Sequence, residues 1–475
     1  MNHHRVSLLS ALVALAFSGT AAASGFQLIE QNASGIGNAY AGSAAVAENA
    51  STIFYNPAGM TQLKDHEVSF GLAMVKPSFK FKNKGSEPVG SGTMAGVVSG
   101  ATPHGNGGDG GSWAAVPDAY MSWALNKDLY IGLGISAPFG LMTEYDKDWL
   151  GSTHSIKFDI KTYNFNPSVA WKVNEQVSLG FGVNYMKMEV EYTKLAAQNL
   201  TAGQLVDAQA GAGACTAMGG AGAILGPLFG LGALPPAAIP CATPNVAAGT
   251  TPAKLKADAD AWGWNIGALI HLTPETKLGL SYRSKVKQKL DGTLTVQGQG
   301  KVDAKASVEL PDTAIVSLTH KLNDRWELLG DVSWTGWSSI PKVIIKNSLA
   351  NQTLGTKFDD TWRVAVGANY QIDPAVKLKF GLAYDQSPVP NDQNRLVSLP
   401  DNDRVWFSFG AQWKPTRDSA LDFGVAYLYV KDTKIDNNGN LNADGTPNTV
   451  NPTGRIKGDY DNNAWIVGLQ YSFAF

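Results

Sequence analysis

The side chains with the chemistry for nucleophilic catalysis are few and poorly spaced for it. Hydrolysis by a serine needs a hydroxyl and an imidazole within hydrogen-bond reach of each other. His154 and Ser155 are adjacent in the sequence, but neighbouring side chains of an extended chain point to opposite faces. His271 and His320 fall beside predicted turns. We therefore expect no catalytic triad, no enzymatic activity and no cofactor.

A glycine-rich stretch, GIGNAYAG at residues 35–42, superficially matches a phosphate-binding loop. Such a loop needs a preceding strand and a following helix whose N-terminus binds the phosphate. Neither is predicted there, and the spacing differs. The net charge of −2 also gives no basic character that a nucleic-acid partner would require. We expect neither nucleotide nor nucleic acid to bind.

The N-terminal residues indicate whether the protein is exported from the cytoplasm. Residues 1–5 form a short basic stretch, residues 6–19 form an apolar run, and residues 21–23 are three alanines. This pattern predicts a signal peptide over residues 1–23, removed in the mature protein. The alternative, a membrane anchor, needs about 20 apolar residues, which is more than this run provides.

The chain has two cysteines, Cys215 and Cys241, and export from the cytoplasm determines their expected oxidation state. In an oxidising compartment we expect them to form a disulfide. Closing the intervening loop would contribute roughly 3–4 kcal/mol to local order. Two lone thiols do not suffice for a metal site, and none is expected.

The composition then narrows the class of protein. Charged residues make up 16% of the chain, against about 25% in an average soluble domain. Beyond the signal peptide, no other apolar run is long enough for a spanning helix. The remaining way to cross a bilayer is a closed β-barrel, whose strands show only a weak alternation of apolar and polar residues.

That alternation is present in several segments. Near the C-terminus the apolar set is Trp465, Val467, Leu469, Tyr471, Phe473 and Phe475. A second apolar set is Val376, Leu378, Phe380, Leu382 and Tyr384. A period of two residues predicts strands with one apolar face. Alternation alone fits either a soluble sandwich or a barrel whose apolar face meets lipid.

Strand length and loop asymmetry distinguish these two folds. The pattern predicts about fourteen strands, near 66–82, 115–126, 128–138, 154–173, 175–195, 255–273, 275–295, 302–322, 324–347, 357–372, 375–386, 402–415, 418–433 and 457–475. Short turns alternate with long connections near 84–112, 139–153, 196–254, 387–401 and 434–456. This asymmetry is typical of bacterial outer-membrane barrels, whose short turns face the periplasm. We therefore predict an all-β, transmembrane antiparallel barrel.

A barrel of this size encloses a lumen that its own side chains cannot fill. Residues 24–62 precede the first predicted strand and have nowhere else to pack. Their small residues let the backbone pass close to a wall, and polar lumen side chains can satisfy its hydrogen bonds. We expect this stretch to form a hatch that plugs the lumen, followed by the barrel at 63–475.

The mature start, SGFQLIEQNASGIGNAYAGSAAVAENASTIFYNPAGM, resembles the hatch of the FadL-type outer-membrane transporters of long-chain fatty acids and other hydrophobic compounds. The resemblance continues in SAPFGL at 136–141, YRSKVK at 282–287 and SPVPNDQNRLVSLPDNDRVWFSFG at 387–410. It covers nearly the whole mature chain. It implies a fourteen-stranded barrel with an N-terminal hatch, through which a hydrophobic ligand moves by passive diffusion.

The resemblance also implies a lateral exit beside a kinked third strand, where this chain has Pro138, Phe139 and Gly140. Proline cannot donate to a strand ladder and glycine weakens it, so a break there also follows from the residues. An ordinary strand end before a loop is the alternative. By the same resemblance Phe26 occupies or gates a central pocket, whereas a frayed terminus is the alternative.

The motif Asn56-Pro57-Ala58 is expected to shape the hatch, because asparagine before proline is a common turn start.

A fatty acid brings a carboxylate that needs a cationic or hydrogen-bonding partner once it is buried. Family members specialised for fatty acids place basic groups near the fifth and tenth strands. The corresponding regions here offer Lys194, Lys357 and Arg363, without a position-for-position match. Arg404 matches the family better, but it could instead form a structural ion pair with Asp401 or Asp403.

The connection at 196–254 is the largest expected extracellular loop, and its stretch at 222–240 is almost free of charge. Such an apolar patch either captures a lipid-like molecule or packs on itself over the barrel mouth. The leading hypothesis is passive transport of long-chain fatty acids or related lipids. The alternatives are transport of neutral aromatic hydrocarbons, export of oxidised fatty acids, or a hydrophilic porin.

The expected location is the outer membrane of a Gram-negative bacterium. The expected partners are a hydrophobic ligand, outer-membrane lipid with lipopolysaccharide, and the barrel-assembly machinery at the C-terminal strand. We expect the protein to be a monomer.

Overall fold

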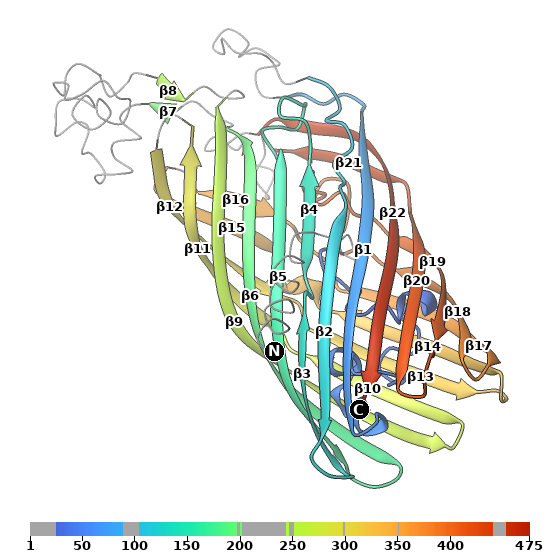
Figure 1. Cartoon of the computed structure of the whole chain (residues 1–475). Coiled ribbons are helices and arrows are strands. Elements are labelled where there is room, and N and C mark those ends of the chain that lie inside the picture. The colour runs from blue at the N-terminus through green and yellow to red at the C-terminus, as the bar shows by residue number, and fades with distance from the viewer. Residues whose placement is uncertain are drawn as a thin grey trace, which may run out of the picture.

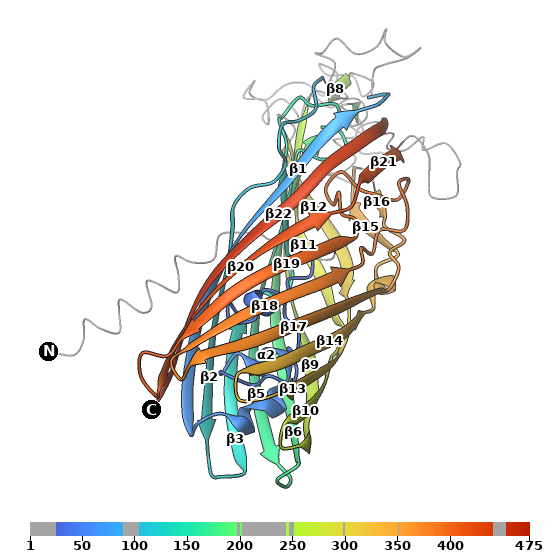
Figure 2. The same cartoon turned by 90° about the vertical axis from the view of Figure 1, so that its right-hand side faces the viewer.

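The computed structural model describes residues 25–88, 104–196, 200–201, 244–246, 251–297, 300–349, 351–439 and 453–475. The described strands form a closed antiparallel barrel (Figures 1 and 2). It closes where the first strand, β1 (His66–Asn83), pairs along its length with the last, β22 (Arg455–Ala474). The fold predicted from the sequence is confirmed, with fourteen strand positions around the wall.

Six of the fourteen positions are built from two consecutive strands. The pairs are β3 (Leu129–Ser136) with β4 (Gly140–Glu144), β10 (Thr276–Arg283) with β11 (Val286–Val296), β12 (Gly300–Leu310) with β13 (Thr313–Lys321), β14 (Trp326–Thr335) with β15 (Lys342–Asn347), β16 (Gln352–Gly355) with β17 (Thr361–Asp373), and β20 (Ser419–Val430) with β21 (Thr433–Asn438). The remaining positions are β1, β2 (Ala114–Ala124), β5 (Lys157–Lys172), β6 (Val177–Leu195), β9 (Pro252–Thr273), β18 (Val376–Asp385), β19 (Arg404–Trp413) and β22. A separate two-stranded sheet pairs β7 (Leu200–Thr201) with β8 (Pro244–Val246) in antiparallel orientation.

Two details of the predicted strands were wrong. Several long strands are interrupted, and Pro311 and Pro341 stand at two of the interruptions, where a missing N–H ends the ladder. The connection predicted at 139–153 contains a strand, β4, which pairs with β5 from Gly140 to Glu144. Five residues are too few for alternation to be recognised in the sequence, and the proline before them looked like a strand end.

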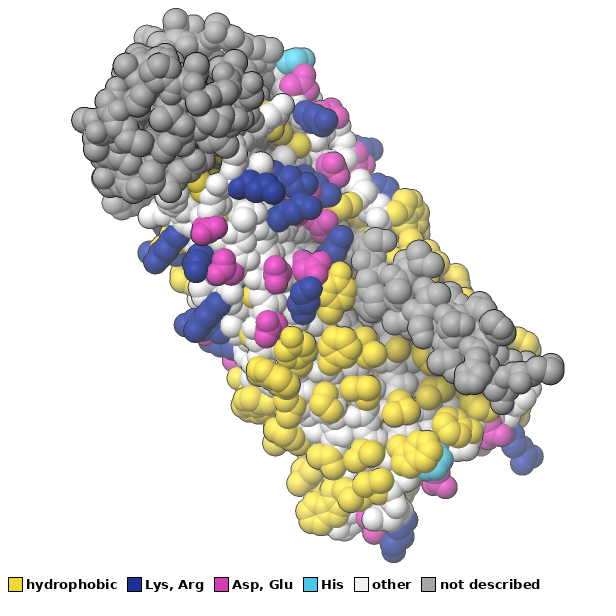
Figure 3. Space-filling view, turned by 60° about the vertical axis from the view of Figure 1, so that its left-hand side comes forward, with side chains coloured by type: hydrophobic (Ala, Val, Ile, Leu, Met, Phe, Trp, Pro, Cys, Tyr) yellow, Lys and Arg dark blue, Asp and Glu magenta, His cyan; other side chains and the backbone are white. Residues whose placement is uncertain are grey.

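The outer surface divides into two zones. Along β9, exposed side chains change from Lys256, Asp258 and Asp260 to Trp262 and Trp264, and then to aliphatic residues. Figure 3 shows the same division: a hydrophobic band covers one half of this face, and charged side chains gather beyond it. Tryptophan at the border is typical of a membrane interface. Among the described residues, no helix is long and apolar enough to cross a membrane.

The residues before β1 lie inside the barrel and are called the internal segment, Gly25–Asp65. It contains only short helices: η1 (Ile36–Asn38), α2 (Thr52–Tyr55) and η2 (Pro57–Gln62). Its backbone runs against glycines of the wall. A Cβ atom on Gly381 would lie 2.1 Å from Asn38 C, and one on Gly279 would lie 2.1 Å from Ala44 O. Inward-facing glycines therefore give this segment the room that its backbone occupies.

Candidate functional site

The barrel wall is interrupted between β3 and β4. Both strands pair with β5, but β2 pairs with β3 only from Ala119 to Ala124. Among the described residues, β4 has no pairing with β2. Ala137–Phe139, which link β3 to β4, therefore stand at a break in the ladder. We call these three residues the wall interruption.

The start of the internal segment, Gly25–Gln31, is bound to the wall interruption and is called the tail. Gln31 Nε2 donates to Ala137 O at 2.9 Å, and Ala137 N donates back to Gln31 Oε1 at 2.9 Å. Leu28 N donates to Pro138 O at 2.8 Å. The tail thus supplies some of the hydrogen bonds that a continuous strand would have made here.

An apolar pocket lies on one side of the tail, and Phe26 lines it. Its walls come mainly from inward-facing side chains of β6, β9, β11, β12 and β15, including Met188, Leu255, Leu290, Ala306, Val308 and Ile345. Phe26 is 7% exposed, and its ring lies 4.9 Å from that of Trp337, in the 3-10 helix η4 (Trp337–Ser339). A pocket with such walls binds an apolar chain through burial of its surface.

The polar side chains around this pocket are few. They are Tyr192, Lys305, Thr356 and Ser398. The lysine is largely exposed and pairs with Asp291 on the outside of the barrel, 3.1 Å away. In the part of the chain that the structure describes, no buried cation lines the apolar pocket.

A second cavity, called the lower cavity, lies on the other side of the tail. Gln27–Ile29, directly after Phe26, line it, together with Pro138 and Phe139 of the wall interruption. Four charged side chains also line it, Arg283, Asp331, Arg363 and Asp385, and unlike Lys305 of the apolar pocket the last three are buried. The rings of Phe26 and Phe139 are 6.0 Å apart and stand between the two spaces.

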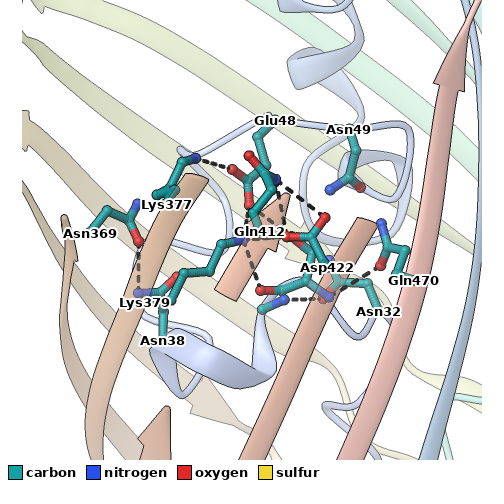
Figure 4. A network of polar contacts seen from close by, with 12 residues as sticks. Asn32, Asn38, Glu48, Asn49, Asn369, Lys377, Lys379, Gln412, Asp422 and Gln470 are labelled. Atoms are coloured by element: carbon teal, nitrogen blue, oxygen red, sulfur yellow. Dashed lines mark hydrogen bonds and ion pairs between the residues drawn. The ribbon is translucent and has the colours of Figure 1, made fainter. Parts of the chain in front are cut away.

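A buried ion cluster fixes the internal segment to β18 and β20 (Figure 4). Lys379 Nζ lies 2.9 Å from Asp422 Oδ1 and also contacts Glu48 of the internal segment, whose other carboxylate oxygen is 2.8 Å from Lys377 Nζ. Burial opposes the charge on Glu48, but the two ammonium groups hold its pKa well below the usual value. Removing one partner of such a cluster would leave a buried charge unpaired, at a cost of about 3–5 kcal/mol.

The predicted ligand-binding cations do not gather at one point. Lys194 is buried at the end of β6 and lines neither the apolar pocket nor the lower cavity. Lys357 is exposed. Arg363 lines the lower cavity, and Arg404 lies 3.5 Å from Asp401 and 3.7 Å from Asp385, as the alternative of a structural ion pair anticipated.

The other predicted site residues fall in two places. Pro138, Phe139 and Gly140 lie at or directly after the wall interruption. Asn56 donates through Nδ2 to Ala44 O at 2.7 Å and to Ala268 O at 2.9 Å. Its Oδ1 accepts from Ala58 N, with Pro57 opening η2. This arrangement agrees with a structural role for the Asn56-Pro57-Ala58 motif.

His154 and Ser155 are not bonded to each other in the structure. His154 Nε2 lies 3.2 Å from Gly454 O, and burial lowers the pKa of this imidazole to about 4. Ser155 Oγ has no hydrogen-bond partner among the described residues. The predicted disulfide between Cys215 and Cys241, the loop at 196–254 in most of its length, and the signal peptide lie outside the described residues.

The sequence analysis missed the residues that build the apolar pocket, although a signal for them exists. In β9 the inward-facing Leu255, Ala257 and Ala259 alternate with outward-facing charged residues, the reverse of the pattern in the lipid-facing zone. Such a reversal indicates that a strand has left the membrane and encloses an apolar interior. Trp337 and Gln31 carried no comparable signal.

Comparison with known proteins gives three findings. Residues 14–475 match the family model described as outer membrane protein transport protein (OMPP1/FadL/TodX). The chain is 28% identical to the long-chain fatty acid transport protein of Escherichia coli K12, over 99% of this chain and 98% of that protein. It is 30% identical to outer membrane protein P1 of Haemophilus influenzae, over the full length of both.

Solved structures agree in fold. A FadL homologue from Pseudomonas aeruginosa superposes with a TM-score of 0.75 at 22% identity, covering 95% of this chain and 99% of that one. The toluene transporter TodX of Pseudomonas putida superposes with a TM-score of 0.60 at 18% identity, covering 94% and 98%.

Proposed function

Because the chain belongs to the outer membrane transport protein family of OMPP1, FadL and TodX, we propose that it carries long-chain fatty acids or related hydrophobic lipids across the outer membrane by passive diffusion. The observation that carries this proposal is the apolar pocket, lined by Phe26, whose ring lies 6.0 Å from that of Phe139 at the break in the wall. The names of the relatives support the substrate class, and the family consists of transporters rather than enzymes.

The route follows from the cost of exposing an acyl chain to water. Each CH2 that stays buried is worth about 0.8 kcal/mol, so a path through the apolar pocket and out sideways into lipid avoids an aqueous step. In this proposal the internal segment acts as the hatch, Phe26 as the gate between the pocket and the lower cavity, and the wall interruption as the exit. The proposed partners are the ligand, lipopolysaccharide around the barrel and the barrel-assembly machinery, and the proposed state is monomeric.

A second candidate is transport of neutral hydrophobic compounds such as aromatic hydrocarbons. The absence of a buried cation from the described lining of the apolar pocket favours it, because a buried carboxylate without a partner is costly. Uptake of oleate compared with methyl oleate separates the two: the leading proposal expects a preference for the acid, and the second candidate expects none.

Filling the apolar pocket tests the proposal. Ala306 lines the pocket, whereas Ser307, the next residue of β12, is exposed on the outer face. We expect Ala306→Trp to reduce oleate uptake about tenfold or more, because the added ring takes the space of the chain.

The matched control, Ser307→Trp, introduces the same side chain on the same strand and should leave uptake unchanged. The measurement is uptake of labelled oleate by cells that lack their own transporter, with the amount of folded barrel checked in each strain. Equal uptake by both variants would refute the proposed route.

A further inference from the structure

The lower cavity has what the apolar pocket lacks, a buried cation with open hydrogen-bond donors. Arg363 is 6% exposed and lines the cavity. Its Nη2 donates to Ala39 O at 2.6 Å. Its Nε and Nη1 have no hydrogen-bond partner among the described residues. Buried donors are normally satisfied, so two open donors on a buried guanidinium call for an explanation.

The other charges of the lower cavity are already engaged. Asp331 accepts hydrogen bonds from the hydroxyls of Ser43 and Ser317, at 2.7 and 2.6 Å. Asp385 lies 3.7 Å from the guanidinium of Arg404. Arg283 donates to Phe54 O at 2.8 Å and also bonds Asn184. Among the described residues that line this cavity, Arg363 is therefore the cation that retains donors for a ligand.

The position of Arg363 relative to the tail indicates that a transported chain passes Phe26 before its head group reaches Arg363. Phe26 lines the apolar pocket, and the residues that follow it line the lower cavity. A chain that passes Phe26 from the apolar pocket therefore enters the space that Arg363 faces. The same space is bounded by Pro138 and Phe139 of the wall interruption, so it is also the last enclosed space before the break in the wall.

We propose that Arg363 binds the carboxylate of the transported fatty acid in the lower cavity, on the exit side of Phe26, so that the head group is recognised after the gate rather than in the apolar pocket. This inference rests on the proposed transport function. Hydrogen bonds from a guanidinium to a carboxylate are charge-assisted and strong, and Nε and Nη1, on different edges of the guanidinium, each keep an open donor for a carboxylate oxygen. The acyl chain then lies toward the wall interruption while the head group is held.

Substitution of Arg363, with Lys194 as the matched control, tests this inference. Lys194 is also a buried cation, 8% exposed, whose Nζ has no partner among the described residues, but it does not line the lower cavity. The variants are Arg363→Gln, Arg363→Lys and Lys194→Gln in the full chain. The measurements are binding to the purified protein and uptake by cells, each with oleate and with the neutral oleyl alcohol.

We expect Arg363→Gln to weaken oleate binding roughly ten- to a hundredfold, as for loss of a hydrogen bond to a charged group, while binding of oleyl alcohol stays within twofold. Arg363→Lys should restore part of the preference for oleate, and Lys194→Gln should retain all of it. Unchanged oleyl alcohol transport shows that the Arg363→Gln barrel is folded and open to ligands.

Two results would overturn the inference while leaving transport intact. One is loss of the preference for oleate in Lys194→Gln but not in Arg363→Gln, which would place head-group recognition at the end of β6, outside the lower cavity. The other is an equal loss of both ligands in Arg363→Gln, which would make Arg363 a structural residue. Failure of the unaltered protein to take up either ligand would instead refute the proposed function.

Discussion

At the scale of single residues, the internal segment contains a buried glutamate, Glu30, and a half-buried one, Glu48, in opposite situations. Glu48 is paired with two lysines, whereas neither carboxylate oxygen of Glu30 has a hydrogen-bond partner among the described residues. Burial raises the pKa of Glu30 to about 7, although the charges of Arg404 and Arg363 oppose the shift. Near neutral pH this side chain is therefore partly protonated.

The raised pKa makes stability depend on pH in a defined window. Between pH 4.5, the ordinary value, and pH 7 the folded protein holds a proton on Glu30 that the unfolded chain has released. Folding stability therefore falls as the pH rises through this window and is lowest above it. Glu30→Gln removes the effect, so we expect it to raise stability at pH 8 by up to about 3 kcal/mol, with little change at pH 4.5.

The measurement is thermal unfolding of the purified barrel, or protease release of the internal segment, at several pH values. Glu48→Gln is the matched control. It removes a charge whose pKa is lowered by its lysine partners, so it should destabilise the protein at neutral pH. A stabilisation by Glu30→Gln that is the same at pH 4.5 and pH 8 would contradict the explanation.

At the scale of elements, the tail and the wall interruption form one unit. Gln31 bonds both the N–H and the C=O of Ala137, and backbone bonds link Leu28 to Pro138 and Gly140 to Phe26. A displacement of the tail by a ligand would therefore remove the hydrogen bonds that hold the interruption. In the proposed route, Phe26 and the wall interruption are expected to open together, because the tail and the interruption share these bonds.

Gln31→Ala tests this coupling. It removes both side-chain hydrogen bonds to Ala137 and a third to Leu28 O, worth about 1 kcal/mol each, so we expect amide hydrogen exchange at Ala137 to accelerate about tenfold or more. Gln27→Ala is the matched control, because Gln27 bonds Thr313 and Thr335 on the opposite side of the tail. It should leave exchange at Ala137 unchanged, and equal acceleration by both variants would argue against a specific clamp.

At the scale of the whole molecule, the barrel and the internal segment are held by different forces. The wall closes through the hydrogen bonds between β1 and β22, which do not involve the internal segment. The internal segment is held by the ion cluster at Glu48 and by contacts with wall glycines. The barrel is therefore expected to form without the first part of that segment, with a lumen that is no longer filled.

Deletion of residues 24–45 should expose this difference. We expect the shortened protein to reach the outer membrane as a folded barrel but to conduct ions steadily in planar bilayers, where the intact protein conducts little, because a lumen of fourteen strands is wide enough for water. The control is heat-dependent mobility in gels, which reports barrel formation. A folded, shortened barrel without added conductance would show that other residues close the lumen.

The sequence by itself predicted the barrel and its strand number through strand length and the alternation of short turns with long connections. The period of two residues within each strand added which side chains share a face. The sequence also pointed to the break at Pro138, because proline cannot donate a backbone hydrogen bond to the ladder and the following Gly140 weakens it. The alternation does not predict how far along the barrel axis a side chain lies. It also does not predict which distant strands that side chain contacts in the lumen.

Only the tertiary structure therefore decided that Arg363 and Lys194, equally plausible in the sequence, lie in different places. It also brought Phe26 to Trp337, more than three hundred residues along the chain. Such contacts depend on strand register and on the closure of the wall, which bring together side chains that no local pattern relates.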